Sequence, residues 1–186
     1  MEQLYLVAVP KTSLIDLAQR LRNQINEAFQ IYGDFQPAFH VTVEVVKIQD
    51  NIDLDKAKEI IRRISKQFSP FSLEVTGFVF FPPPYKAITL AINKNNEIEI
   101  LSGLIYEALR EQGMIGREDF HSWKFHITVA SPFGAKREWS AEEFNAAYML
   151  VKDAKISGQC IIDTLELWRP IVTPTEMIAD IFSLKG

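Results

Sequence analysis

Two five-residue stretches, FHVTV at residues 39–43 and FHITV at residues 125–129, differ at a single position. They lie nearly half of the 186-residue chain apart and contain two of its three histidines. β-Branched and aromatic residues dominate both stretches, which predicts a β-strand in each. The repeat therefore indicates an internal duplication in which each half supplies one histidine-bearing strand.

Side chains alternate between the two faces of a strand, so each motif sorts its residues by face. His40 and Thr42 share one face, on which Glu44 follows, and His126 and Thr128 share the corresponding face of the second strand. The apolar residues between them are expected in the core. If an approximate two-fold axis relates the two halves, both polar faces line one groove.

Outward from the motifs, the order of the expected elements is repeated as well. Each half is predicted to contain a strand, a helix, the histidine-bearing strand, a second helix and a further strand. Apolar periodicity and stop signals define these segments. The expected strands cover residues 4–9, 39–46, 71–81, 85–92, 123–130, 156–168 and 176–184, and the expected helices cover residues 13–32, 53–69 and 96–112 and a segment that follows Ser140.

This order predicts an α+β fold with two pseudo-symmetric lobes of antiparallel sheet, helices on the outside and a central groove. We expect residues 1–186 to form one bilobal domain, with lobe 1 at about 1–84 and lobe 2 at about 85–186, and with last strands that are free to cross between lobes. Pro82-Pro83-Pro84 is the expected junction, and the loop over residues 114–121 is expected to be mobile. The alternative is a doubly wound parallel sheet, whose strands would be apolar throughout.

The composition limits the partners that the protein can have. The net charge is −4 and the sequence pI is about 5.5, which argues against an extended nucleic-acid surface because phosphate contacts need a basic footprint. A small nucleotide or an RNA end in a local pocket remains compatible. Three features favour a cytoplasmic protein without a membrane span. The chain has a single cysteine, Cys160, it shows no basic leader, and its apolar runs are short.

The paired histidines indicate acid/base chemistry. Imidazole titrates near pKa 6.5, so one ring can accept a proton while its partner donates one. Threonine hydroxyls beside them could hold the oxygens of a phosphoryl group, and such a site needs neither a metal nor another cofactor. Two other interpretations remain open: structural histidines, and a metal site, for which the sequence offers no third ligand at an obvious spacing.

With these motifs, the chain resembles the 2H phosphoesterase superfamily, which is named for two His-x-Thr/Ser-x motifs, and especially its bacterial 2′-5′ RNA ligase and RNA 2′,3′-cyclic phosphodiesterase branch. The resemblance implies a bilobal fold with a water-filled groove and metal-independent cleavage or formation of 2′-linked phosphoesters. By the motif match, it implies catalytic roles for His40 and His126 and phosphate-binding roles for Thr42 and Thr128. Many members carry proline before the motif histidine, where this chain has phenylalanine.

Other residues are weaker candidates for substrate contact. Lys124 shares the expected face of His126, and aromatic side chains near strand ends could stack on a nucleobase. Glu44 could bind a ribose hydroxyl or stay solvated at the edge of the groove, His121 is expected on the opposite face of the second motif strand, and Cys160 is expected to be buried. The aromatic and arginine candidates are Phe81, Tyr85, Phe133, Trp168, Arg137 and Arg169.

The sequence thus predicts an enzyme, a two-histidine phosphodiesterase that acts on 2′,3′-cyclic or 2′-5′ linked phosphoesters of RNA or nucleotides. Two alternatives remain: a protein that binds an RNA end or a nucleotide without chemistry, and a 2′-5′ RNA ligase, which runs the same chemistry in reverse.

Overall fold

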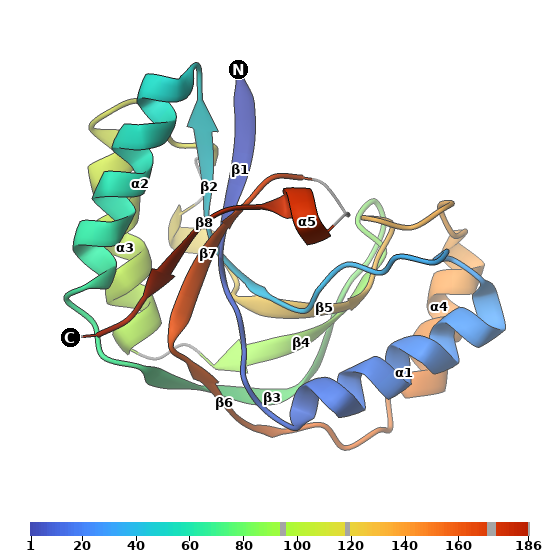
Figure 1. Ribbon diagram of the computed structural model, residues 1–186. Helices are drawn as coiled ribbons and strands as arrows, with labels where there is room; N and C mark the ends of the chain where they lie inside the picture. The colour runs from blue at the N-terminus through green and yellow to red at the C-terminus, as the bar shows by residue number, and fades with distance from the viewer. Residues whose placement is uncertain (94–95, 118–119, 171–173, 186) are drawn as a thin grey trace.

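The computed structural model describes residues 1–93, 96–117, 120–170 and 174–185, and in this part of the chain eight strands form one sheet (Figure 1). The sheet order is β6-β3-β4-β5-β2-β1-β7-β8. The strands are β1 (Glu2–Ala8), β2 (Val41–Ile48), β3 (Phe71–Phe81), β4 (Ala87–Asn93), β5 (His126–Ala130), β6 (Gly158–Ile162), β7 (Thr164–Trp168) and β8 (Ile178–Ser183). The helices are α1 (Leu14–Phe29), α2 (Asn51–Ser65), α3 (Asn96–Arg110), α4 (Ala141–Val151), the short α5 (Pro174–Met177) and a 3-10 turn, η1 (Phe120–Ser122).

All the strand pairs of this sheet are antiparallel, which confirms the predicted α+β class and excludes the doubly wound alternative. The two histidine-bearing strands, β2 and β5, are neighbours at its centre. Two of the last strands, β6 and β7, pair with strands of the first repeat. Strand β6 pairs with β3, which also pairs with β4, and β7 pairs with β1 as well as with β8.

Two pairs of helices lie on the outer side of the curled sheet, as Figure 1 shows. Helices α2 and α3 pack on each other and against β2, and helices α1 and α4 pack on each other, with α1 also against β5. Each helix turns an apolar stripe inward; in α3, for example, Ile98, Leu101, Ile105 and Leu109 recur every three or four residues and are fully buried. The core therefore lies between the helices and the outer face of the sheet, and the opposite face of the central strands is left for a site.

Helix starts differ in part from the expectation. Ser13 precedes α1, but its side chain makes no capping bond, and the Thr12 hydroxyl accepts from the Leu14 amide. Helix α2 begins two residues early because the Asp50 carboxylate accepts the amides of Ile52 and Asp53. The helix predicted after Ser140 begins with a capping box, in which the Ser140 hydroxyl accepts from the Glu143 amide and the Glu143 carboxylate accepts from the Ser140 amide.

Two further expectations are corrected by strand pairing. The single strand predicted over residues 156–168 is two strands, β6 and β7, which pair with β3 and β1. Residues 114–117, expected in a mobile loop, lie along β2, since Lys47 N donates to Met114 O and Gly116 N to Val45 O, both at 2.8 Å. A Cβ at Gly116 would lie 2.5 Å from Val45 Cγ1, so this approach requires glycine. Residues 118–119 of that loop lie outside the described residues.

Candidate active site

A single pair of residues joins the two motif strands. Val41 of β2 pairs with Ile127 of β5, and both side chains are buried in the core. Antiparallel pairing places each motif histidine opposite the motif threonine of the other strand. Such opposite residues have Cβ atoms about 5 Å apart, and the two histidines lie on a diagonal of about 7–8 Å. We call these four half-buried residues, His40, Thr42, His126 and Thr128, the His/Thr quartet.

Both motif histidines are oriented by the backbone two residues before them. His40 Nδ1 lies 2.8 Å from Ala38 O, and His126 Nδ1 lies 2.8 Å from Lys124 O. A carbonyl oxygen can only accept, so Nδ1 carries the proton in each ring. The neutral tautomer therefore leaves Nε2 as the nitrogen that can exchange a proton with a ligand.

Burial lowers the pKa of both rings from the ordinary value of 6.5. The bonds to Ala38 O and Lys124 O oppose this effect, because they favour the protonated rings. The pKa of His40 is lowered further by the charges of His126 and Arg22. The charge of His126 thus affects the titration of His40, and both rings are largely neutral at pH 7 in the free protein.

An aromatic ring from an outer strand lies beside each histidine. The Trp168 ring of β7 is 4.8 Å from the His40 ring in an edge-on arrangement, and the Phe81 ring of β3 is 5.0 Å from the His126 ring. Trp168 Nε1 donates to the Glu166 carboxylate at 2.6 Å, which fixes the indole. The quartet is therefore flanked by apolar surfaces on both sides, and one of them, Trp168, is itself anchored.

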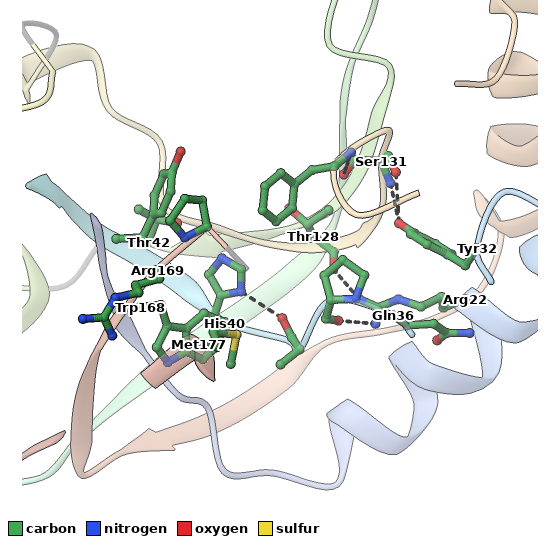
Figure 2. Close-up of a pocket in the computed structure, with 15 residues that line it drawn as sticks. Arg22, Tyr32, Gln36, His40, Thr42, Thr128, Ser131, Trp168, Arg169 and Met177 are labelled. Carbon is green, nitrogen blue, oxygen red and sulfur yellow. Dashed lines mark hydrogen bonds between the residues drawn. The ribbon is translucent and has the colours of Figure 1, made fainter. Parts of the chain in front are cut away.

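A cavity of about 270 Å³ opens beside the quartet, on the side of His40 (Figure 2). At one end lie Trp168, Arg169 and Met177, and at the other end lie Arg22, Tyr32, Gln36 and Ser131, with Thr128 between them. This volume is close to the roughly 300 Å³ at the lower end of small-molecule sites. The lining is completed by Tyr5, Pro37, Ala38, His40, Thr42, Phe133 and Pro170.

The profile of the 2′-5′ RNA ligase superfamily matches residues 10–172. The chain belongs to the 2′-5′ RNA ligase superfamily. The resemblance to 2H phosphoesterases drawn from the two motifs is therefore confirmed at the level of the family. No curated protein matches the chain by sequence at a significant level.

Solved structures share the fold of this superfamily member at low identity. Escherichia coli LigT in its apo form has a TM-score of 0.64 at 10% identity and covers 100% of this chain and 98% of its own. The protein TT0787 of Thermus thermophilus has a TM-score of 0.63 at 16% identity, with 99% and 98% covered. Kluyveromyces marxianus Usb1 has a TM-score of 0.53 at 13% identity, with 98% and 97% covered. At these identities the likeness concerns the fold.

Only some of the weaker candidates for substrate contact line the cavity. Trp168, Arg169 and Phe133 line the cavity, and Phe81 contacts His126 without lining it. Arg169 is also paired with Glu2 at 3.2 Å. Tyr85 is 70% exposed and lies outside this cavity lining.

Several other predicted contacts lie elsewhere. The Lys124 side chain is exposed and outside the cavity lining, and Lys124 contributes to the site only the carbonyl that accepts from His126 Nδ1. Arg137 donates to the Glu143 carboxylate and to Phe29 O, next to α4 and the end of α1. His121 is exposed and lies in η1, so the expectation that it lies on the second motif strand is wrong. Cys160 is buried as expected, and burial raises the pKa of its thiol.

Glu44 does not lie on the face of His40. Leu6 of β1 pairs with Glu44 while the next residue, Val7, pairs with Thr42, so β2 contains an extra residue and its alternation reverses there. The Glu44 carboxylate is fully buried and accepts from Arg117 Nε at 2.7 Å and Nη2 at 3.0 Å. The expectation of a solvated groove carboxylate is therefore wrong, because a bulge moved it to the core side.

Sequence reasoning missed Arg22, which is 2% exposed and lines the cavity. A signal for it was present. Arg22 stands four residues after Ala18 and three before Ile25, on the stripe of α1 that is otherwise apolar and buried. A charged residue in that position is rarely buried without a specific partner. Tyr32, Gln36 and Ser131 were missed as well, and their polar types give no comparable signal.

Within the described ranges, no three His, Cys, Asp or Glu side chains gather as a metal-ligand group, and no helix has the length and apolar character needed to cross a bilayer.

Proposed function

We propose that this protein is a metal-independent phosphodiesterase that acts on 2′,3′-cyclic or 2′-5′ linked phosphoesters of RNA or nucleotides. The pairing of Val41 with Ile127 carries the proposal, because it sets two imidazoles and two hydroxyls around one space on the open face of the sheet. The adjoining cavity suits one nucleotide better than a duplex. E. coli LigT has been solved in complex with NADP⁺, 3′-AMP, ATP and phosphate, which supports a small nucleotide or an RNA end as ligand.

In this proposal the phosphorus atom lies between the two histidines. One neutral ring takes a proton through Nε2 from the attacking water as the new P–O bond forms, and the other, protonated ring gives its proton to the leaving 2′ or 3′ oxygen as that P–O bond breaks. The two rings then exchange protonation states. Thr42 and Thr128 donate their hydroxyl protons to the non-bridging oxygens, where negative charge increases in the transition state.

The lining of the cavity supports a position for the nucleoside. Trp168 and Phe133 offer aromatic faces on which a nucleobase could stack, a contact worth about 1–3 kcal/mol per base. Arg169 supplies a cation at this end. We therefore place the nucleoside beside His40, with the scissile phosphate at the quartet. A 5′-hydroxyl that attacked a 2′,3′-cyclic phosphate in place of water, with the 3′ oxygen as leaving group, would form a 2′-5′ linkage. The name of the superfamily favours this ligation as a second candidate.

The test is a panel of 2′,3′-cyclic nucleotides and 2′-5′ dinucleotides, assayed with and without EDTA. We expect turnover that EDTA does not abolish, and losses of about 10²- to 10⁴-fold in His40→Ala and in His126→Ala. His121→Ala is the matched control, since His121 is exposed and outside the quartet, and it should keep full activity. Loss of activity in EDTA, or an active His126→Ala, would refute the proposal. Nucleotide binding without any turnover would favour a binding protein.

A further inference from the structure

The central strands separate beyond their single pair of residues, and side chains fill the gap. Backbone carbonyls of both motif strands accept hydrogen bonds from side chains that lie in this gap. On β2, Thr42 O accepts from Trp123 Nε1 at 3.2 Å, and Val43 O accepts from Ser102 Oγ and Arg117 Nη2. On β5, both bonds come from Arg22, with Nε 2.7 Å from Val129 O and Nη2 3.0 Å from Thr128 O. A buried arginine therefore binds backbone carbonyls of each motif strand, Arg117 on β2 and Arg22 on β5.

The two arginines differ in their charge balance. Arg117 is neutralised by the buried carboxylate of Glu44 at 2.7 Å. Arg22 bonds only to carbonyls, with Nη1 2.6 Å from Pro37 O as the third acceptor, and no carboxylate pairs with it in the chain as described. Its guanidinium also stacks on the Phe39 ring, with the Cζ atom 3.7 Å from the ring centroid. A buried charge without a counter-ion is rare.

Arg22 contacts both motifs at once. Pro37 and Phe39 lead directly into His40, while Thr128 belongs to the opposite strand, so one side chain fixes the distance between the two halves of the quartet. Arg22 also borders the cavity, at the end away from Trp168 (Figure 2). A charge buried in a low-dielectric wall acts over a longer range than one in water.

We propose that Arg22 is a positioning residue of this site and that its unneutralised charge makes the cavity a receptor for an anionic phosphoryl group. The nature of the anion rests on the proposed function. The position of the guanidinium and its lack of a counter-ion do not.

Other charges around the cavity do not cancel this one. The ionisable groups that border it are Arg169, which is paired with Glu2, the phenols of Tyr5 and Tyr32, and His40; His126, which lies just outside the lining, interacts with His40. Burial lowers the pKa of Arg22 to about 10, which still leaves it protonated at pH 7. Its charge lowers the pKa of His40, and no such effect acts on His126. The site is therefore electrostatically asymmetric although the motifs are nearly identical.

Two variants separate charge from position. Arg22→Lys keeps the charge but loses the planar fork that reaches three carbonyls from three nitrogens, whereas Arg22→Gln keeps an amide donor but loses the charge. Arg20→Gln, exposed on the same helix, is the matched control. Binding of inorganic phosphate is measured by NMR titration, and the titration of His40 and His126 is followed in the same spectra, which also show whether each variant is folded.

We expect Arg22→Gln to weaken phosphate binding at least tenfold and to raise the pKa of His40 but not that of His126. Arg22→Lys should bind phosphate within a few-fold of the parent yet show a lower kcat, because the strands are no longer fixed. In the unaltered protein, phosphate should shift the Arg22 Nε–H resonance and leave that of Arg137 in place. Unchanged phosphate affinity and His40 titration in folded Arg22→Gln, or an Arg22 resonance that ignores phosphate, would overturn the inference. Phosphate binding that depends on Arg22 without any turnover would overturn the proposed function alone.

Discussion

Replacing Glu44 by Gln tests whether the strand bulge has converted a groove carboxylate into part of the core. Glu44 is fully buried, its partner Arg117 is 5% exposed, and the carboxylate also accepts the Val45 amide at 2.8 Å. The substitution keeps the size of the side chain and removes its charge. Arg117 would then be buried without a counter-ion, and the new side-chain amide would present a donor where a carboxylate oxygen now accepts.

The size of the effect follows from this burial. Removing one partner of a buried ion pair costs about 3–5 kcal/mol. For a domain of this size, each kcal/mol lowers Tm by about 2–4 °C, so the midpoint of Glu44→Gln should fall by about 6–20 °C. The Glu44→Met, Arg117→Met double variant should recover much of this loss, because well-packed apolar side chains can replace a buried pair.

The fall in Tm is measured by thermal unfolding monitored with circular dichroism, and urea unfolding gives a second measure of stability. Asp153→Asn is the control, since Asp153 pairs with Lys152 at an exposed position with 85% of its side chain accessible. That variant should melt with the parent protein. If Glu44→Gln also melted with the parent, the carboxylate would be solvated and the bulge argument would be wrong.

Three further predictions concern the site. First, kcat/KM should be highest below pH 6.5 and fall as the pH rises, because burial lowers the pKa of His40 and His126 and the general acid loses its proton there; a maximum near pH 8 would contradict this. Second, Thr128→Val should lower kcat by about 10²- to 10³-fold with little change in Tm, as loss of a transition-state donor does, and steady-state kinetics with a melting curve test it. Third, Trp168→Ala should raise KM by about 5- to 150-fold, the equivalent of one stacked base, and Phe81→Ala should raise it less, because only Trp168 lines the cavity; equal effects on KM would speak against placing the nucleoside beside His40.

Local patterns in the sequence were sufficient for the class of fold and for the quartet. Alternating apolar residues around both motifs predicted strands with a polar open face, and helical stripes predicted where the four long helices lie. The duplication then predicted that two like strands would meet. These features depend on neighbours within a few residues, where periodicity and propensity act.

Long-range pairing was beyond such patterns. The prediction of one strand over residues 156–168 was wrong because alternation does not show which strands a segment joins, and β6 and β7 pair with different partners. The position of Glu44 was wrong because a one-residue bulge reverses the facing of every residue that follows. Nothing in the residues 43–46 themselves marks that bulge.

What the sequence alone determined is therefore the chemistry of the motifs: two histidines and two threonines, placed alternately with core residues on strands of the same kind. Only the tertiary structure decided how far the surroundings of the two motifs differ. The cavity opens on the side of His40, one buried arginine is neutralised and the other is not, and Trp168 and Phe81 flank the two histidines differently. The physical reason is that burial and charge compensation depend on groups brought together from distant parts of the chain, such as Arg22 and Thr128, which no local pattern relates.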